Sequence, residues 1–172
     1  LSATSNAIHA IHSTDLSLIC VGTPSMPNGS LNLNYVRTVC EEIGIALKDK
    51  ASFHVVVIRS TMLPGTMRNV VITTIESFSG NKSGEGFGVC INPEFLREST
   101  AVFDFYSPPK TVIGESDTKS GDILAELYKG LDAPLIRTSI ETAEMVKYTD
   151  NVWHALKVGF ANEIGSICKE VG

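Results

Sequence analysis

Short apolar runs alternate with longer amphipathic stretches along the chain. Runs rich in Val, Ile and Leu predict five strands, and apolar residues at helical spacing between them predict three helices. Because the runs are apolar on successive residues, they fit strands covered on both faces, as in a parallel sheet. The alternation favours a doubly wound α/β fold without internal repeats. The expected strands are 16–22, 54–60, 87–92, 110–114 and 134–138, and the expected helices are 34–48, 67–78 and 118–130.

The segment after the last of these strands has a different pattern. From about Ile140 onward there is no Pro, and Gly occurs only singly before the end. This predicts one helix of roughly 30 residues, longer than most helices of globular proteins. We expect it to leave the sheet domain, which divides the chain into residues 1–138 and 139–172.

Composition and charge exclude several classes of function. The 172 residues are 43% hydrophobic, which is enough for one packed core. The formal net charge is -5 and Lys and Arg do not cluster, so we expect no nucleic-acid partner. No apolar run approaches the roughly 20 residues of a membrane span, and residues 1–12 lack the order of a signal peptide. We therefore expect a soluble, cytoplasmic protein without a membrane partner.

The four cysteines have no metal-site or disulfide spacing. Cys20, Cys40, Cys90 and Cys168 are scattered, and no CxxC pair occurs. We interpret them as reduced thiols and expect no metal site.

Three loops that follow successive strands contain the unusual polar residues. They are 20–30, 59–66 and 92–100, and each mixes Gly or Pro with Ser, Thr or Glu. In an open α/β sheet, ligands bind at the carboxyl ends of the strands, where loops present backbone N–H groups. One such loop is an ordinary connection, whereas three in succession indicate a binding site.

The long helix carries a polar stripe. At about 100° per residue, Lys147, Asn151, His154 and Asn162 fall within one narrow arc. Either this is a solvated face or the helix lines a cleft. Val158 falls in the same arc, which favours the cleft.

Together, five stretches of the chain resemble the nucleotide-sugar 6-dehydrogenases, the family of UDP-glucose and GDP-mannose dehydrogenases. The similarity spans nearly the whole chain in order, and the last two stretches are most similar to the members that oxidise GDP-mannose. The implied fold is the second half of a Rossmann-like parallel-sheet domain (1–138), followed by the start of a central dimerisation helix (139–172). The stretches are ICVGTP (19–24), RSTMLPGT (59–66), NPEFLRES (92–99), PPKTVIGE (108–115) and AEMVKYTDNVWHALKVGFANEIG (143–165).

The resemblance implies an activity, a cofactor and a partner. Family members oxidise the C6 alcohol of a nucleotide sugar to a carboxylate with two NAD, through an aldehyde and a cysteine thioester. The implied substrate is GDP-mannose and the implied product is GDP-mannuronate for an alginate-type polysaccharide. The resemblance also implies a homodimer or higher homo-oligomer formed through the long helix.

The resemblance further implies roles for single residues. Thr61 would position the hydrolytic water, Glu98 would be its general base, and Lys147 with Asn151 would stabilise the oxyanion. Glu94 would lie at the same site; a structural role at a helix N-terminus remains an alternative for it. Desolvation beside an apolar strand can raise the pKa of a glutamate towards that of a good base, and a lysine aimed at an oxyanion supplies preorganised charge. The implied cofactor site is Val21, Gly22, Thr23, Ser60, Thr61 and Glu98, and the implied substrate site is Phe95, Leu96, Glu98, Lys147, Asn151, His154 and Asn162.

Two departures from the family pattern leave other interpretations open. The chain begins past the strand–GxGxxG–helix unit, since GEGFG (84–88) precedes a strand, and none of its cysteines lies in the family's nucleophile motif. We therefore expect an internal fragment that is inactive when isolated. The alternatives are a UDP-glucose 6-dehydrogenase, another nucleotide-sugar or β-hydroxyacid dehydrogenase, and a non-catalytic sugar-nucleotide-binding or dimerisation module.

Overall fold

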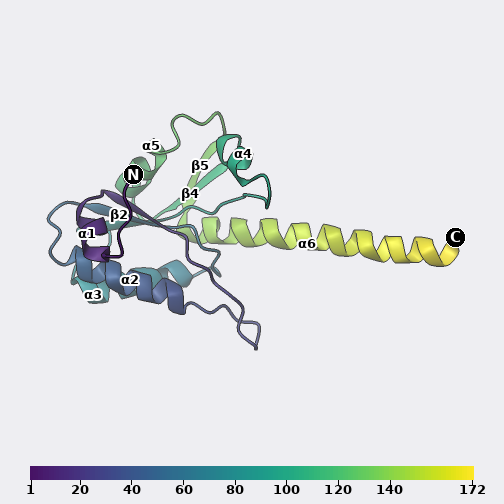
Figure 1. The fold of residues 1–172 in the computed structure, drawn as a ribbon, viewed down its shortest axis with the longest axis horizontal. Coiled ribbons are helices and arrows are strands. Elements are labelled where there is room, and N and C mark those ends of the chain that lie inside the picture. The colour runs from purple at the N-terminus through teal and green to yellow at the C-terminus, as the bar shows by residue number, and fades with distance from the viewer.

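A five-stranded sheet with helices on both faces forms the body of the protein, and one long helix leaves it (Figure 1). The computed structural model describes residues 1–172. Along the sheet the order is β1-β2-β3-β4-β5. The strands are β1 (Leu16–Ile19), β2 (His54–Ile58), β3 (Phe87–Ile91), β4 (Thr111–Glu115) and β5 (Leu135–Ser139). The helices are α1 (Ala7–His12), α2 (Asn34–Leu47), the π-helical turn η1 (Met67–Ile72), α3 (Thr73–Ser79), α4 (Ala101–Tyr106), α5 (Thr118–Glu126) and α6 (Ile140–Val171).

The core lies on both faces of the central strands. Every residue of β2 and β3 is buried. The larger apolar cluster packs α2, η1, α3 and the start of α6 on one face, and a smaller cluster packs α5 on the other. This confirms a doubly wound α/β arrangement.

One strand pair contradicts the expectation of a parallel sheet. β4 runs antiparallel to β3, whereas the other three pairs are parallel. A parallel neighbour needs a crossover along the sheet face. The only helix between β3 and β4 is α4, whose six residues span about 9 Å, about half the length of a five-residue strand. The connection therefore stays at the carboxyl end of β3, and β4 starts there and runs back.

Several local predictions also differ from the structure. The edge strand β5 is mostly exposed, although its sequence suggested burial. Residues 67–78 form the turn η1 followed by α3 in place of one regular helix. The helices α1 and α4 were not predicted, because six residues are too few to show a helical period.

The long helix α6 was predicted correctly and crosses the sheet before it leaves the domain. The Ser139 hydroxyl caps it by accepting the Thr142 N–H at 3.3 Å. Gly114 of β4 lies beneath it, where a Cβ would come within 2.5 Å of Ala143 Cβ, so only glycine lets the helix pack this closely. From residue 151 onward every residue is exposed, and this part projects away from the sheet (Figure 1). None of the helices, α6 included, combines the length and hydropathy that crossing a membrane requires.

Candidate functional site

The loops after β1 and β2 are tied together at the carboxyl edge of the sheet. The Thr23 hydroxyl donates to the carbonyl oxygen of Thr61 at 2.8 Å, and the Ser60 hydroxyl donates to that of Val21 at 2.5 Å. Between them, Gly22 has open space around it, since an added Cβ would meet nothing within 4 Å. The five predicted cofactor residues on these loops therefore form one ledge, which is exposed at Gly22, whereas Ser60 is buried. This geometry fits a dinucleotide lying across the ends of parallel strands.

The loop after β3 is fixed by a polar network at its base. Asn92 is buried and its side-chain amide donates to the carbonyl oxygen of Val112 at 2.8 Å. The Arg59 guanidinium donates to Asn92 Oδ1 and to the Tyr128 hydroxyl, both at 2.8 Å, and that hydroxyl also binds Asn92 Oδ1. Burial raises the pKa of Tyr128, so the phenol stays protonated and donates. The network holds the start of the loop rigidly against the sheet.

Lys147 on α6 is held against this loop. Its ammonium donates to the carbonyl oxygen of Glu94 at 2.6 Å and to Glu94 Oε1 at 3.2 Å. The lysine side chain is only 10% exposed, whereas the glutamate is 32% exposed. A nearly buried ammonium with a carboxylate partner is a preorganised positive charge.

A hollow of about 640 Å³ opens beside Lys147. Asn151 and His154 line it on the helix side, and Phe95 and Leu96 line it from the loop. Five of the seven predicted substrate residues, Lys147 included, are thus brought together. Its remaining lining residues are Arg97, Phe103, Asp104, Ser107, Pro109, Lys110 and Asp150.

Lys110 adds a second cation to the hollow. Its ammonium lies 4.2 Å from the centre of the Phe95 ring and 3.2 Å from Asp150 Oδ1. Lys147 lies 5.4 Å from the same ring, so Phe95 has an ammonium from each element near it. Lys110 was not among the predicted site residues, although it lies in the PPKTVIGE stretch.

Two predicted substrate residues, Glu98 and Asn162, lie apart from the hollow. Glu98 is exposed and does not line it. Its neighbour Ser99 has a left-handed backbone (φ 67°), and Asp104 accepts hydrogen bonds from the Arg97 backbone and guanidinium and from the Thr100 hydroxyl. Asn162 is exposed on the projecting part of α6, more than two helical turns beyond Asn151.

None of the four cysteines lines the hollow. Cys40 and Cys90 are buried, and burial raises the pKa of each thiol to about 12, so both are inert. Cys20 and Cys168 are exposed, at the end of β1 and near the end of α6. Two of the four cysteines therefore pack in the core, and the other two lie at the surface away from the hollow.

The fold and this edge together define a nucleotide-binding α/β domain of the Rossmann-like type. The chain belongs to the UDP-glucose/GDP-mannose dehydrogenase family. Residues 1–132 match the profile described as "UDP-glucose/GDP-mannose dehydrogenase family, NAD binding domain", and residues 141–172 match that of the family's central domain.

Similar proteins and solved structures agree with this assignment. The chain is 61% identical over 172 residues to the GDP-mannose 6-dehydrogenase of Pseudomonas savastanoi pv. phaseolicola, matching 100% of this chain and 39% of the relative. It is similar to the crystal structure of a ternary complex of GDP-mannose dehydrogenase from Pseudomonas aeruginosa, with a TM-score of 0.96, 60% identity and coverage of 98% and 39% of the two chains. A UDP-glucose dehydrogenase from Pyrobaculum islandicum matches with a TM-score of 0.89, 41% identity and coverage of 94% and 37%. The chain thus spans about two fifths of the length of these relatives.

Proposed function

We propose that the gene product carrying this chain is an NAD-dependent dehydrogenase that oxidises the C6 alcohol of GDP-mannose to the carboxylate of GDP-mannuronate. The observation that supports this most strongly is 60–61% identity over the whole chain to several GDP-mannose 6-dehydrogenases, against 37–39% to two UDP-glucose 6-dehydrogenases. Within this proposal, residues 1–138 contribute part of the NAD domain and 139–172 begin the central domain.

The ledge formed by the first two loops is the proposed cofactor site. Val21, Gly22 and Thr23 on one loop and Ser60 and Thr61 on the next would hold NAD, which accepts hydride from the sugar carbon when bound. The open space at Gly22 supports a close approach of the ligand to the backbone.

The hollow is the proposed sugar-nucleotide site. As hydride leaves the alcohol carbon for NAD, the hydroxyl gives up its proton to solvent, and the Lys147 ammonium and the Asn151 amide would stabilise the negative charge that develops on that oxygen. Phe95, Leu96 and His154 would contact the sugar nucleotide, and Asn162 would approach it from the projecting part of α6. In the later hydrolysis of the thioester, Thr61 would orient the water molecule and Glu98 would take the proton of that water. Glu98 follows Arg97, which lines the hollow.

A homo-oligomer in the cytoplasm completes the proposal. Exposed apolar side chains along α6 favour association of copies through this helix. All four cysteines are free thiols, which suits a reducing compartment.

A substrate comparison tests the function. Purified gene product is incubated with NAD and either GDP-mannose or UDP-glucose, and NADH is followed by absorbance. We expect kcat/KM for GDP-mannose to exceed that for UDP-glucose by at least about 100-fold, with two NADH formed per sugar. A preference for UDP-glucose would reassign the substrate, and no NADH with either sugar would contradict the enzyme proposal.

A further inference from the structure

Glu144 on α6 is a fully buried acid to which the proposed function gives no role. Its side chain is 0% exposed. Oε2 accepts the N–H of Gly65 at 2.7 Å, and Oε1 accepts the N–H of Met67 at 2.9 Å. Burial raises the pKa of the carboxyl above its ordinary value, although the two N–H groups act to lower it. A buried carboxylate needs such compensation, which here comes from the backbone of one loop.

The two N–H groups belong to the end of the loop that carries Thr61. Gly65 has φ +90°, a left-handed conformation that glycine adopts without strain. Met67 begins η1, so its N–H is one of the groups that a helix start leaves unpaired, and negative charge is favoured there. Glu141 and Arg68, the charged side chains that act on Glu144, bind each other. Glu144 therefore interacts mainly with the backbone of this loop.

The next turn of α6 holds the other loop of the site. Lys147 lies three residues after Glu144, about 4.5 Å along the helix axis. It donates to Glu94 in the loop after β3. Two successive turns of one rigid helix thus bind the two loops that carry the proposed catalytic groups.

We propose that Glu144 is a positioning residue that sets the loop of Thr61 at a fixed distance from Lys147. The catalytic part of this inference rests on the proposed function. Glu144 acts through Thr61 and does not touch the sugar or the cofactor. If the two hydrogen bonds to the Glu144 carboxylate are lost, the start of the loop is still held by its hydrogen bonds to the loop after β1, but the end of the loop is free to shift.

Amide hydrogen exchange tests whether Glu144 holds this loop, and it does not depend on enzyme activity. Glu144→Gln keeps the size of the side chain, but its NH2 group faces one of the two N–H donors and cannot accept. We expect exchange of segment 62–68 in the full gene product to be about tenfold faster or more in this variant. The control Glu163→Gln removes an exposed carboxylate on the projecting part of the same helix and should leave segment 62–68 unchanged. If Glu144→Gln does not fold, Glu144→Asp, which shortens the reach, carries the same test.

Kinetics test the positioning role. With GDP-mannose and NAD, we expect kcat per folded molecule to fall about tenfold or more in Glu144→Gln, while KM for GDP-mannose stays within about threefold. If Glu144 acts through Thr61, Glu144→Gln with Thr61→Ala should be no slower than Thr61→Ala alone, within about twofold.

The outcomes separate the two proposals. Wild-type exchange in Glu144→Gln, or a lower unfolding midpoint with unchanged kcat per folded molecule, overturns the positioning role. The positioning role is also overturned if the double variant, Glu144→Gln with Thr61→Ala, lowers kcat by the product of the two single effects. If the wild-type protein makes no NADH from GDP-mannose, the proposed function fails, and the exchange experiment still decides whether Glu144 holds the loop.

Discussion

Lys147 shows at the scale of a single residue what the structure adds to a sequence motif. The motif suggested a cation near the reacting oxygen, and the structure places the ammonium against the β3 loop, nearly buried, next to the hollow. Loss of one donor to an oxyanion typically costs about 3 kcal/mol of transition-state stabilisation. We expect Lys147→Ala to lower kcat of the gene product about 100-fold or more. Lys169→Ala, which removes an exposed lysine near the end of the same helix, should leave steady-state turnover unchanged.

Near-normal turnover in Lys147→Ala would remove this lysine from the mechanism. Circular dichroism must show the same helix content in both variants. We expect the fold to survive, because Glu94 is partly exposed and water can replace the ammonium.

For Glu98 we expect a different result, because its proposed role is in the hydrolysis step, late in the reaction. If it activates the hydrolytic water, Glu98→Gln should form NADH in a first burst and then stall with a covalent sugar adduct. Intact-protein mass spectrometry detects that adduct. Glu85→Gln, at another exposed glutamate, should turn over without accumulating it. A uniformly slow reaction with no adduct would place Glu98 outside the hydrolysis step.

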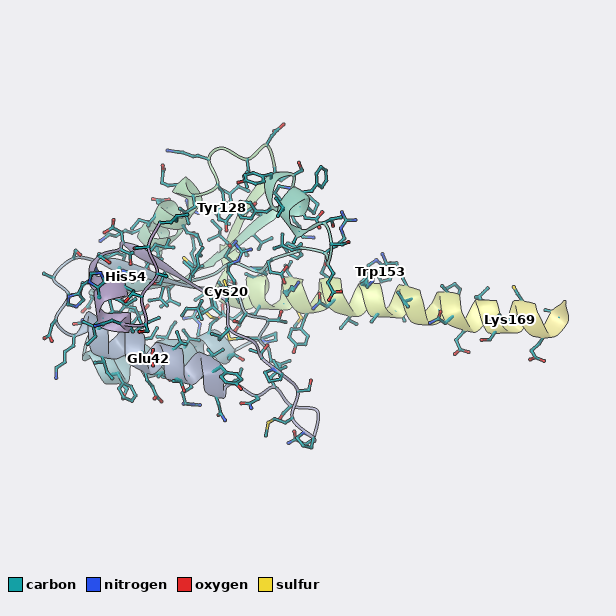
Figure 2. All side chains as sticks on the ribbon, viewed as in Figure 1. Cys20, Glu42, His54, Tyr128, Trp153 and Lys169 are labelled. Carbon is teal, nitrogen blue, oxygen red and sulfur yellow. The ribbon has the colours of Figure 1, made fainter.

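At the scale of elements, the buried His54 of β2 contacts β1 and the turn after α1, at the end of the sheet opposite the site. Nδ1 lies 3.1 Å from the carbonyl oxygen of Thr14, so it must donate, and Nε2 lies 2.9 Å from the Ser17 hydroxyl. The contacts join β2 to β1 and to Thr14, which lies between α1 and β1, and Figure 2 shows His54 far from the projecting part of α6. Burial is the main reason that the pKa of His54 is lowered, so the folded protein favours the neutral ring.

A pH dependence of stability follows from this shift. The unfolded chain binds a proton near the ordinary histidine pKa of about 6.5, whereas the folded chain resists it. The stabilisation by neutral His54 is therefore present above that value and is lost as the pH falls below it. We expect the free energy of unfolding to decrease between about pH 7 and pH 5, and to decrease less in His54→Gln. His9→Gln, at an exposed histidine of α1, should keep the wild-type slope, and equal slopes in all three proteins would contradict the assignment.

Local patterns predicted the elements better than their directions or the site. The runs around Val55 and Val89 predicted buried strands, because consecutive apolar residues indicate a strand that is covered on both faces. The antiparallel turn of β4 depends on where the connection goes, which no strand pattern encodes. Motifs predicted the neighbourhood of Lys147, Glu94 and Asn151, whereas the carboxylate of Glu144 escaped notice. Its partners are backbone N–H groups 77 and 79 residues away, and backbone donors have no sequence signature.

At the scale of the whole molecule, α6 has a polar side and an apolar side. At about 100° per residue, Lys147, Asn151 and His154 lie on one side of the helix. On the opposite side, within an arc of about 80°, lies a stripe of apolar side chains that are 43% to 78% exposed. Figure 2 shows Trp153 on the part of α6 beyond the sheet domain. The members of the stripe are Trp153, Leu156, Phe160, Ile164, Ile167 and Val171.

Because the two sides point apart, copies of the protein can associate along the apolar stripe without covering the hollow. A charge in the middle of such an interface would have to be desolvated without a partner, so we expect Phe160→Glu to dissociate the proposed oligomer of the gene product. Sedimentation velocity should show a species of lower mass, while circular dichroism keeps the helical signal. Val158→Glu is the matched control, since it also replaces an exposed apolar residue of α6 by glutamate but on the side of the hollow. If both variants sediment like the wild type, the apolar stripe does not hold copies of the protein together. If Val158→Glu alone dissociates the copies, the interface lies on the side of the proposed site. Substrate binding and association would then compete for one face of the helix.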